Sequence, residues 1–162
     1  TVGMLPMLDK LLEDKEWPHV RLAVSVHSAE PSTRKEIVPT SYDGFLEKLQ
    51  DWGKRYLAKF GNNKHHLTFE YVMLREINDT AHHAQALYKF VNKVGLVKVN
   101  LIPYNLTDNP FKRSLDPVIA DFKETLEAHG VTCTIRKTMG DDIAAACGQL
   151  LKLGEKANKV QA

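Results

Sequence analysis

The stretch LTFEYVMLREINDTAHHAQALYKFVNKVGLVKVNLIPY, residues 67–104, decides the fold class, because one run of chain holds a strand, a helix and a second strand. Residues 67–74 are rich in β-branched and aromatic side chains, which predicts a strand. Asn78-Asp79-Thr80 is a typical helix start, and Gly95 follows the predicted helix. Residues 97–104 predict the next strand. A helix between two strands indicates parallel pairing, since a tight turn cannot connect parallel neighbours.

The same alternation extends to both sides of this stretch. Upstream, a mostly apolar run predicts a buried strand, and a proline-containing loop separates it from an amphipathic helix. Downstream, Asp116 and Pro117 open a helix that stops at Gly130. The further predicted elements are strand 20–26, helix 42–60, strand 131–136 and a short alanine-rich helix over about 141–153.

These elements predict an α/β fold with a parallel sheet. Four strands are too few to close the usual eight-stranded barrel, so the chain forms either a small open sheet or part of a barrel whose other strands lie upstream. The pattern does not choose between the two. In both, ligands gather beyond the carboxyl ends of the strands, where loops and helix N-termini meet.

Length, composition and charge limit the classes of protein to which the chain can belong. A chain of 162 residues with 43% hydrophobic and 26% charged residues fits one globular domain, 1–162. Thr1-Val2-Gly3 resembles neither a natural start nor a signal peptide, so we expect the chain to begin inside a longer protein. Charged residues interrupt every apolar run, which predicts a soluble protein with no membrane span. A net charge of +2 neither requires nor excludes RNA binding.

Polar segments follow three of the predicted strands. They are Ser25-Val26-His27, Asn105, and Arg136-Lys137-Thr138. At one rim, a hydroxyl, an imidazole and an amide would hold the hydroxyl, carboxylate or amino groups of a small ligand. The residues alone favour a plainer role for Ser25 and His27, as a strand-end cap, and a turn role for Asn105 is equally open.

The spacing of the two cysteines does not by itself indicate a chemical role for either of them. Cys133 lies in a predicted strand and Cys147 in the alanine-rich helix, so both fit small core residues in a reducing compartment. Neighbouring Arg136 and Lys137 would favour a Cys147 thiolate, whereas Asp141 and Asp142 would oppose it. The adjacent histidine pairs 65–66 and 82–83 point in different directions and do not indicate a metal site. The sequence also lacks GxGxxG, GxSxG and P-loop motifs.

Four segments, in order and spacing, resemble the RlmN/Cfr family of radical S-adenosylmethionine (SAM) methyltransferases, which act on adenine in RNA. The most specific is Gly140 to Leu150, GDDIAAACGQL. The others are Leu22 to His27 (LAVSVH), Thr68 to Leu74 (TFEYVML) and Val99 to Asn105 (VNLIPYN). The resemblance runs from Thr1 to about Leu150, and it implies that the chain is the C-terminal part of a partial (β/α) radical-SAM barrel.

The resemblance also implies roles for individual residues. Ser25, Val26 and His27 match a Ser-Leu-His segment that lines the SAM site, and Asn105 matches a SAM-contacting asparagine. Cys147 matches the cysteine that is methylated by one SAM and then delivers a one-carbon unit to adenine. A second SAM, cleaved at a 4Fe-4S cluster, supplies the radical. No metal ligand is implied within this chain.

The same resemblance implies that essential parts lie elsewhere. The family's CxxxCxxC cluster motif, its Gly-Glu segment, general base and resolving cysteine belong to an N-terminal half, so we expect this chain alone to be inactive. Met139 and residues 106–109 depart from the family pattern, which affects expected RNA contacts there. The implied substrates are large-subunit ribosomal RNA and, as a second possibility, transfer RNA, in the cytoplasm or in an organelle of a eukaryote. The resemblance leaves carbon 2 and carbon 8 of adenine open as the target, and carbon 2 is the commoner in the family.

Two other functional classes stay open at this point. A stand-alone, catalytically inactive binding module for a ligand or RNA would keep the fold without the cluster half, and would hide its sheet edge by dimerising. A thiol-redox protein using Cys147 is the weaker reading, because no second cysteine lies at CxxC spacing.

Overall fold

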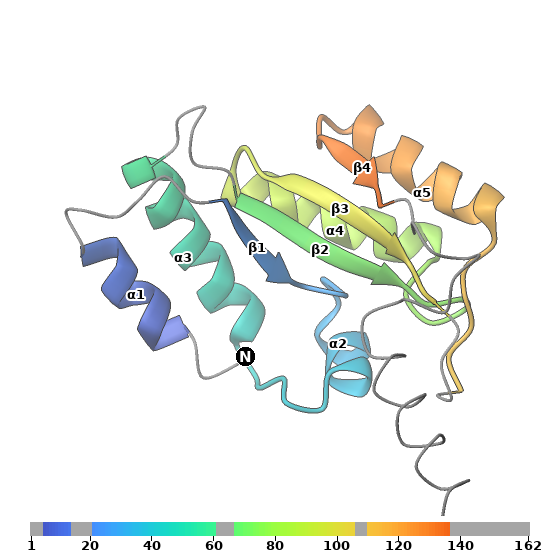
Figure 1. The fold of residues 1–162 in the computed structure, drawn as a ribbon, viewed down its shortest axis with the longest axis horizontal. Coiled ribbons are helices and arrows are strands. Elements are labelled where there is room, and N and C mark those ends of the chain that lie inside the picture. The colour runs from blue at the N-terminus through green and yellow to red at the C-terminus, as the bar shows by residue number, and fades with distance from the viewer. Residues whose placement is uncertain (1–4, 14–20, 61–66, 106–109, 137–162) are drawn as a thin grey trace, which may run out of the picture.

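A single parallel sheet forms the centre of the molecule (Figure 1). The computed structural model describes residues 5–13, 21–60, 67–105 and 110–136. The strands lie in the order in which they occur along the chain, and every neighbouring pair is parallel. This confirms the predicted α/β class. The strands are β1 (Leu22–Ser25), β2 (Leu67–Met73), β3 (Lys98–Pro103) and β4 (Cys133–Ile135).

Three helices, over residues 45–60, 81–94 and 116–128, cover one face of this sheet. Each connects two adjacent parallel strands, so right-handed crossovers place all three on the same side. Figure 1 shows α4 lying behind β2 and β3. Two further helices complete the described chain, and α1 packs on α3. The helices are α1 (Leu5–Glu13), α2 (Pro31–Ile37), α3 (Phe45–Phe60), α4 (Ala81–Val94) and α5 (Asp116–Ala128).

Aromatic side chains bind the helical layer to the sheet. Phe69 of β2 packs on Phe90 of α4 with ring centroids 5.5 Å apart, and Tyr71 packs on Phe122 of α5 at 5.4 Å. All four rings lie in the buried core. Because these strand residues are two apart, they point to the same face, which is the face that the helices cover.

The opposite face of the sheet carries no helix among the described elements. Along β2 the side chains alternate strictly between buried and partly exposed, and β3 does the same after its first residue. Parallel strands in α/β proteins are normally apolar on both faces, because helices cover both. Here the partly exposed positions include Thr68, Glu70 and Asn100. A polar face of this kind is suited to contact a ligand or another segment.

The structure adds two helices that we did not predict and shortens several elements. The proline-containing loop after β1 is in part the helix α2, which Pro31 begins at a position where its missing N–H costs nothing. Strand β1 ends at Ser25, one residue short of the predicted end, because His27 adopts φ 58°. The predicted helix over 141–153 lies outside the described residues.

Candidate functional site

The end of β1 places the predicted Ser25-Val26-His27 segment at the carboxyl edge of the sheet. Ser25 is exposed on the helix-free side, whereas the side chain of Val26 is fully buried in the core. The Val26 amide donates to the Glu70 carbonyl at 2.9 Å, and its carbonyl accepts from the Ser28 amide at 2.8 Å. Val26 therefore anchors the segment, and only the second lone pair of its carbonyl remains to accept a hydrogen bond from a ligand.

His27 lies at a sharp turn in the left-handed region of backbone conformation. A positive φ is uncommon for a residue other than glycine and persists where the surroundings impose it. The fully buried Asn78 imposes it here. Its Nδ2 donates to the His27 carbonyl at 2.8 Å and to the Val72 carbonyl at 2.8 Å, while its Oδ1 accepts from the Leu74 amide at 2.7 Å.

The ring of His27 is held as one neutral tautomer. The Val72 amide donates to Nδ1 at 3.2 Å, so Nδ1 carries no proton and the neutral ring keeps its proton on Nε2. Burial lowers the pKa of His27 to about 4, and the positive charge of Arg34 contributes further. His27 is therefore a neutral hydrogen-bond donor through Nε2 at physiological pH.

Asn105 lies at the same edge of the sheet, directly after β3. It is partly exposed. Val72, which bonds the His27 ring, pairs with Ile102, so Asn105 lies three positions beyond the level of His27. Strand β2 separates the two, so at the usual strand spacing and rise they lie about 10 Å apart across the sheet and about 10 Å apart along it, roughly 14 Å in all. The described residues form no direct bond between them, and this spacing suits two ends of one ligand.

A polar row crosses the helix-free face below this edge, and the sequence pattern did not predict it. Ser25 pairs in register with Glu70, Glu70 with Asn100, and Asn100 with Thr134. The Thr134 hydroxyl donates to Asn100 Oδ1 at 3.2 Å. The signal was present in the sequence as polar residues at alternate positions of strands that otherwise read as buried. Their common row became evident only from the strand register.

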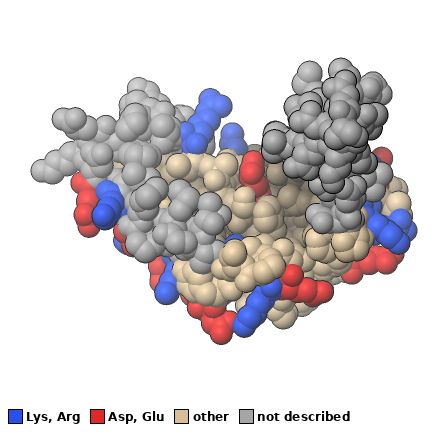
Figure 2. Space-filling view, turned by 60° about the horizontal axis from the view of Figure 1, so that its bottom comes forward, with Lys and Arg blue, Asp and Glu red and all other residues tan. Residues whose placement is uncertain are grey.

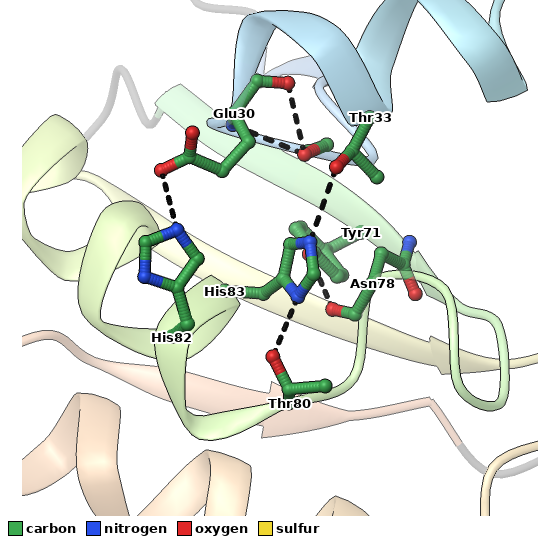
Figure 3. A network of polar contacts seen from close by, with 8 residues as sticks. Glu30, Thr33, Tyr71, Asn78, Thr80, His82 and His83 are labelled. Carbon is green, nitrogen blue, oxygen red and sulfur yellow. Dashed lines mark hydrogen bonds and ion pairs between the residues drawn. The ribbon is translucent and has the colours of Figure 1, made fainter.

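Polar contacts join α2 to the start of α4 behind the edge (Figure 3). His83 lies between Thr80, 2.7 Å from its Nδ1, and Thr33, 3.2 Å from its Nε2. His82 Nε2 lies 3.2 Å from the Glu30 carboxylate. The second histidine pair thus connects two helices. No group of three or more metal-binding side chains occurs within the described ranges.

The structure describes only one of the two cysteines. Cys147, with the 137–162 region, lies outside the described residues, and so do His65 and His66. Cys133 is buried at the start of β4, and burial raises the pKa of its thiol to about 12. Cys133 is therefore an inert core residue, as the sequence predicted.

The charges on the described surface do not point to one kind of ligand. On the face shown in Figure 2, acidic and basic side chains alternate along the margin of the described part of the molecule. Arg136, the third predicted edge residue, is exposed, and its amide donates to the Leu101 carbonyl at 2.8 Å. Within the described ranges, no helix is both long and apolar enough to cross a bilayer.

Known proteins resemble this chain in sequence and in structure. No protein-family model matches it. The dual-specificity RNA methyltransferase RlmN of Alcanivorax borkumensis is 41% identical over 152 residues, which are 93% of this chain and 39% of that protein. The chain thus spans about two fifths of this relative.

The structural comparison agrees. A crystal structure of a radical SAM methyltransferase from Sphaerobacter thermophilus superposes with a TM-score of 0.80 at 36% identity, covering 92% of this chain and 42% of that one. A domain of the pyruvate-formate lyase-activating enzyme from Bacteroides vulgatus superposes with a TM-score of 0.62 at 13% identity, which shows a shared fold alone. Over nearly its whole length, this chain is thus similar to about two fifths of an RNA methyltransferase and of a radical SAM methyltransferase.

Proposed function

We propose that this chain is the C-terminal portion of a radical SAM methyltransferase that methylates carbon 2 of adenine in ribosomal RNA, and in transfer RNA as a second substrate. The observation that carries the proposal is the 41% identity to RlmN along 93% of the chain. A stand-alone binding module is less well supported, because it predicts no such identity to a methyltransferase.

The residues at the carboxyl edge fit the groups of SAM. Ser25 offers an exposed hydroxyl, His27 a fixed Nε2–H donor, and Asn105 a partly exposed amide with both donor and acceptor atoms. These are neutral, directional partners for ribose hydroxyls, ring nitrogens and the amino-acid end of SAM. In our proposal SAM supplies the methyl group, and a 4Fe-4S cluster supplies the electron for the radical reaction.

The described residues do not fit a cluster. Several cysteine thiolates hold such clusters, and the only cysteine within the described ranges is buried with a raised pKa. We therefore place the cluster ligands, together with the remaining barrel strands, in the upstream part of the full-length protein. That segment would lie over the polar face of the sheet and cover the edge of β1.

Cys147 is the proposed methyl carrier. Carbon 2 of adenine is electron-poor and does not attack the methyl group of SAM by itself, whereas a thiolate is a strong nucleophile. The Cys147 thiolate would accept the methyl group as SAM leaves as S-adenosylhomocysteine, and it would lose its proton to solvent. The methylated sulfur then holds the carbon beside the base.

The proposal is tested in the full-length protein with two variants that act on different steps. We expect Cys147→Ala to abolish methyl transfer from labelled SAM to RNA while SAM binding stays close to wild type. Asn105→Ala should weaken SAM binding about three- to tenfold, the usual effect of one hydrogen bond. Cys133→Ala serves as the matched cysteine control and should retain transfer. Undiminished transfer by Cys147→Ala would overturn the assignment.

A further inference from the structure

Arg34 is a buried cation without a polar partner. It lies on α2, its exposed fraction is 3%, and its Nε and Nη1 make no hydrogen bond. Its guanidinium lies over the ring of Phe45, 4.1 Å from the ring centroid. Burial lowers the pKa of Arg34, which reflects the same unfavourable desolvation of its charge. An arginine offers five N–H donors in a planar fork, so this position leaves most of its binding capacity unused.

The contact with Phe45 does not account for this arrangement. A cation over an aromatic ring contributes less than the removal of an ion from water costs, and an excellent polar partner is needed to offset that cost. The remaining donors therefore suit an anion, and the planar fork of arginine matches the oxygens of phosphate and carboxylate.

Arg34 also lines a small cavity between α2 and the beginning of α3. The cavity volume is about 110 Å³, far below the roughly 300–1,000 Å³ of pockets that hold whole organic ligands. It therefore suits one small oxyanion. Lys35 and Ser41 add donors, while the exposed ion pair between Lys35 and Asp43 is long at 3.4 Å and contributes little. Asp43 and Glu47 also line the cavity, and their carboxylates oppose the two cations.

The cavity lies beside the candidate SAM site. Helix α2 begins four residues after His27, and Arg34 is close enough to lower the pKa of that histidine. An anion on Arg34 would thus lie next to the edge where the proposed reaction takes place. In an RNA substrate, the group of this size and charge nearest to a reacting base is a backbone phosphate.

We propose that Arg34 and its cavity bind a single phosphate group, which in the full-length protein belongs to the RNA backbone beside the target adenine. The RNA assignment rests on the proposed function, whereas phosphate binding by the chain does not. The two claims are therefore tested separately.

The first test uses the full-length protein, without RNA or SAM, and inorganic phosphate. We expect phosphate to raise the melting temperature more than chloride of equal ionic strength, because a ligand that binds the folded state stabilises it. Arg34→Met should weaken the apparent phosphate affinity by about tenfold or more. The affinity of Arg34→Lys should lie between those of wild type and Arg34→Met. Arg55→Met, at an exposed arginine paired with Asp9, is the matched control and should respond as wild type.

Two outcomes of the first test would overturn the site. One is a wild-type chain that shows no phosphate-specific stabilisation. The other is an Arg34→Met variant that has a lower melting temperature but an unchanged response to phosphate, because this would mean that Arg34 acts only through its packing on Phe45.

The second test uses the full-length protein and RNA. We expect Arg34→Met to weaken RNA binding about tenfold and to reduce the slope of log affinity against log salt by about one phosphate contact. SAM binding without RNA should be unchanged. Phosphate binding with unaltered RNA binding would overturn the RNA assignment, and a tenfold loss of SAM affinity would instead identify the SAM carboxylate as the ligand.

Discussion

At the end of β1, the ring of His27 accepts a hydrogen bond from the Val72 amide, and this bond requires an unprotonated Nδ1. The pKa of His27 is about 4 in the folded chain and 6.5 in the unfolded one. As the pH falls from 6.5 to 4, the unfolded state takes up a proton that the folded state does not, so the free energy of unfolding falls, by at most about 3 kcal/mol.

A variant isolates this effect. His27→Asn tolerates the left-handed backbone and retains an acceptor for Val72, but it does not titrate in this range. Urea unfolding at pH 4 to 7.5 should therefore show a smaller loss of stability on acidification in His27→Asn than in wild type. The same acid-induced loss in both would contradict the neutral, buried ring.

Asn78 provides the second residue-scale prediction. Replacing it with alanine leaves the partly buried carbonyls of His27 and Val72 and the buried amide of Leu74 without their side-chain partner. We expect Asn78→Ala to lower the free energy of unfolding by about 2–4 kcal/mol. Asn92→Ala, which removes an exposed bond to the His129 carbonyl, should change it by less than about 0.5 kcal/mol. Equal effects in chemical unfolding would disprove the role of Asn78.

These residues mark how far sequence reasoning reached at this scale. The positions of Ser25, His27 and Asn105 at one edge followed from strand endings alone. The role of Asn78 did not, because its bond to His27 joins residues 51 positions apart. Such a contact depends on which strands lie side by side, and no local pattern records that.

At the scale of elements, helices α3 and α4 meet at Gly53. A Cβ on Gly53 would lie 2.6 Å from Cγ1 of Val94, inside normal contact distance. Gly53→Ala should therefore destabilise the chain by about 1–2 kcal/mol, although alanine favours helix by about 1 kcal/mol. Chemical unfolding checks this, and adding Val94→Ala should recover part of the loss. A more stable Gly53→Ala variant would show that the helices are not in this close contact.

Elements with a long periodic pattern of apolar side chains were predicted well, and short elements without such a pattern were not. The helix 42–60 and the strand 67–74 were found within a few residues, because each carries a long amphipathic or β-branched pattern. Helix α2 has seven mostly polar residues and no such pattern. It is supported by contacts from outside its own segment, above all Arg34 on Phe45 and Thr33 on His83.

At the scale of the whole molecule, one face of a parallel sheet is covered by helices and the other carries a polar row. Sequence pattern left open whether the sheet was complete or part of a barrel, because closure depends on strands that the pattern does not contain. The described strands form one sheet with β1 and β4 at its edges. In our account the upstream segment pairs with β1, so the polar face becomes the interior of the barrel.

The most direct test of this account is peptide mass spectrometry of the full-length protein, purified after incubation with SAM. The account predicts one added methyl group on the peptide that contains Cys147 and none on buried Cys133. Methyl-labelled SAM should transfer its label to the same peptide. An unmodified Cys147, in protein that still methylates RNA, would contradict the central claim that this chain carries the methyl group between SAM and the base.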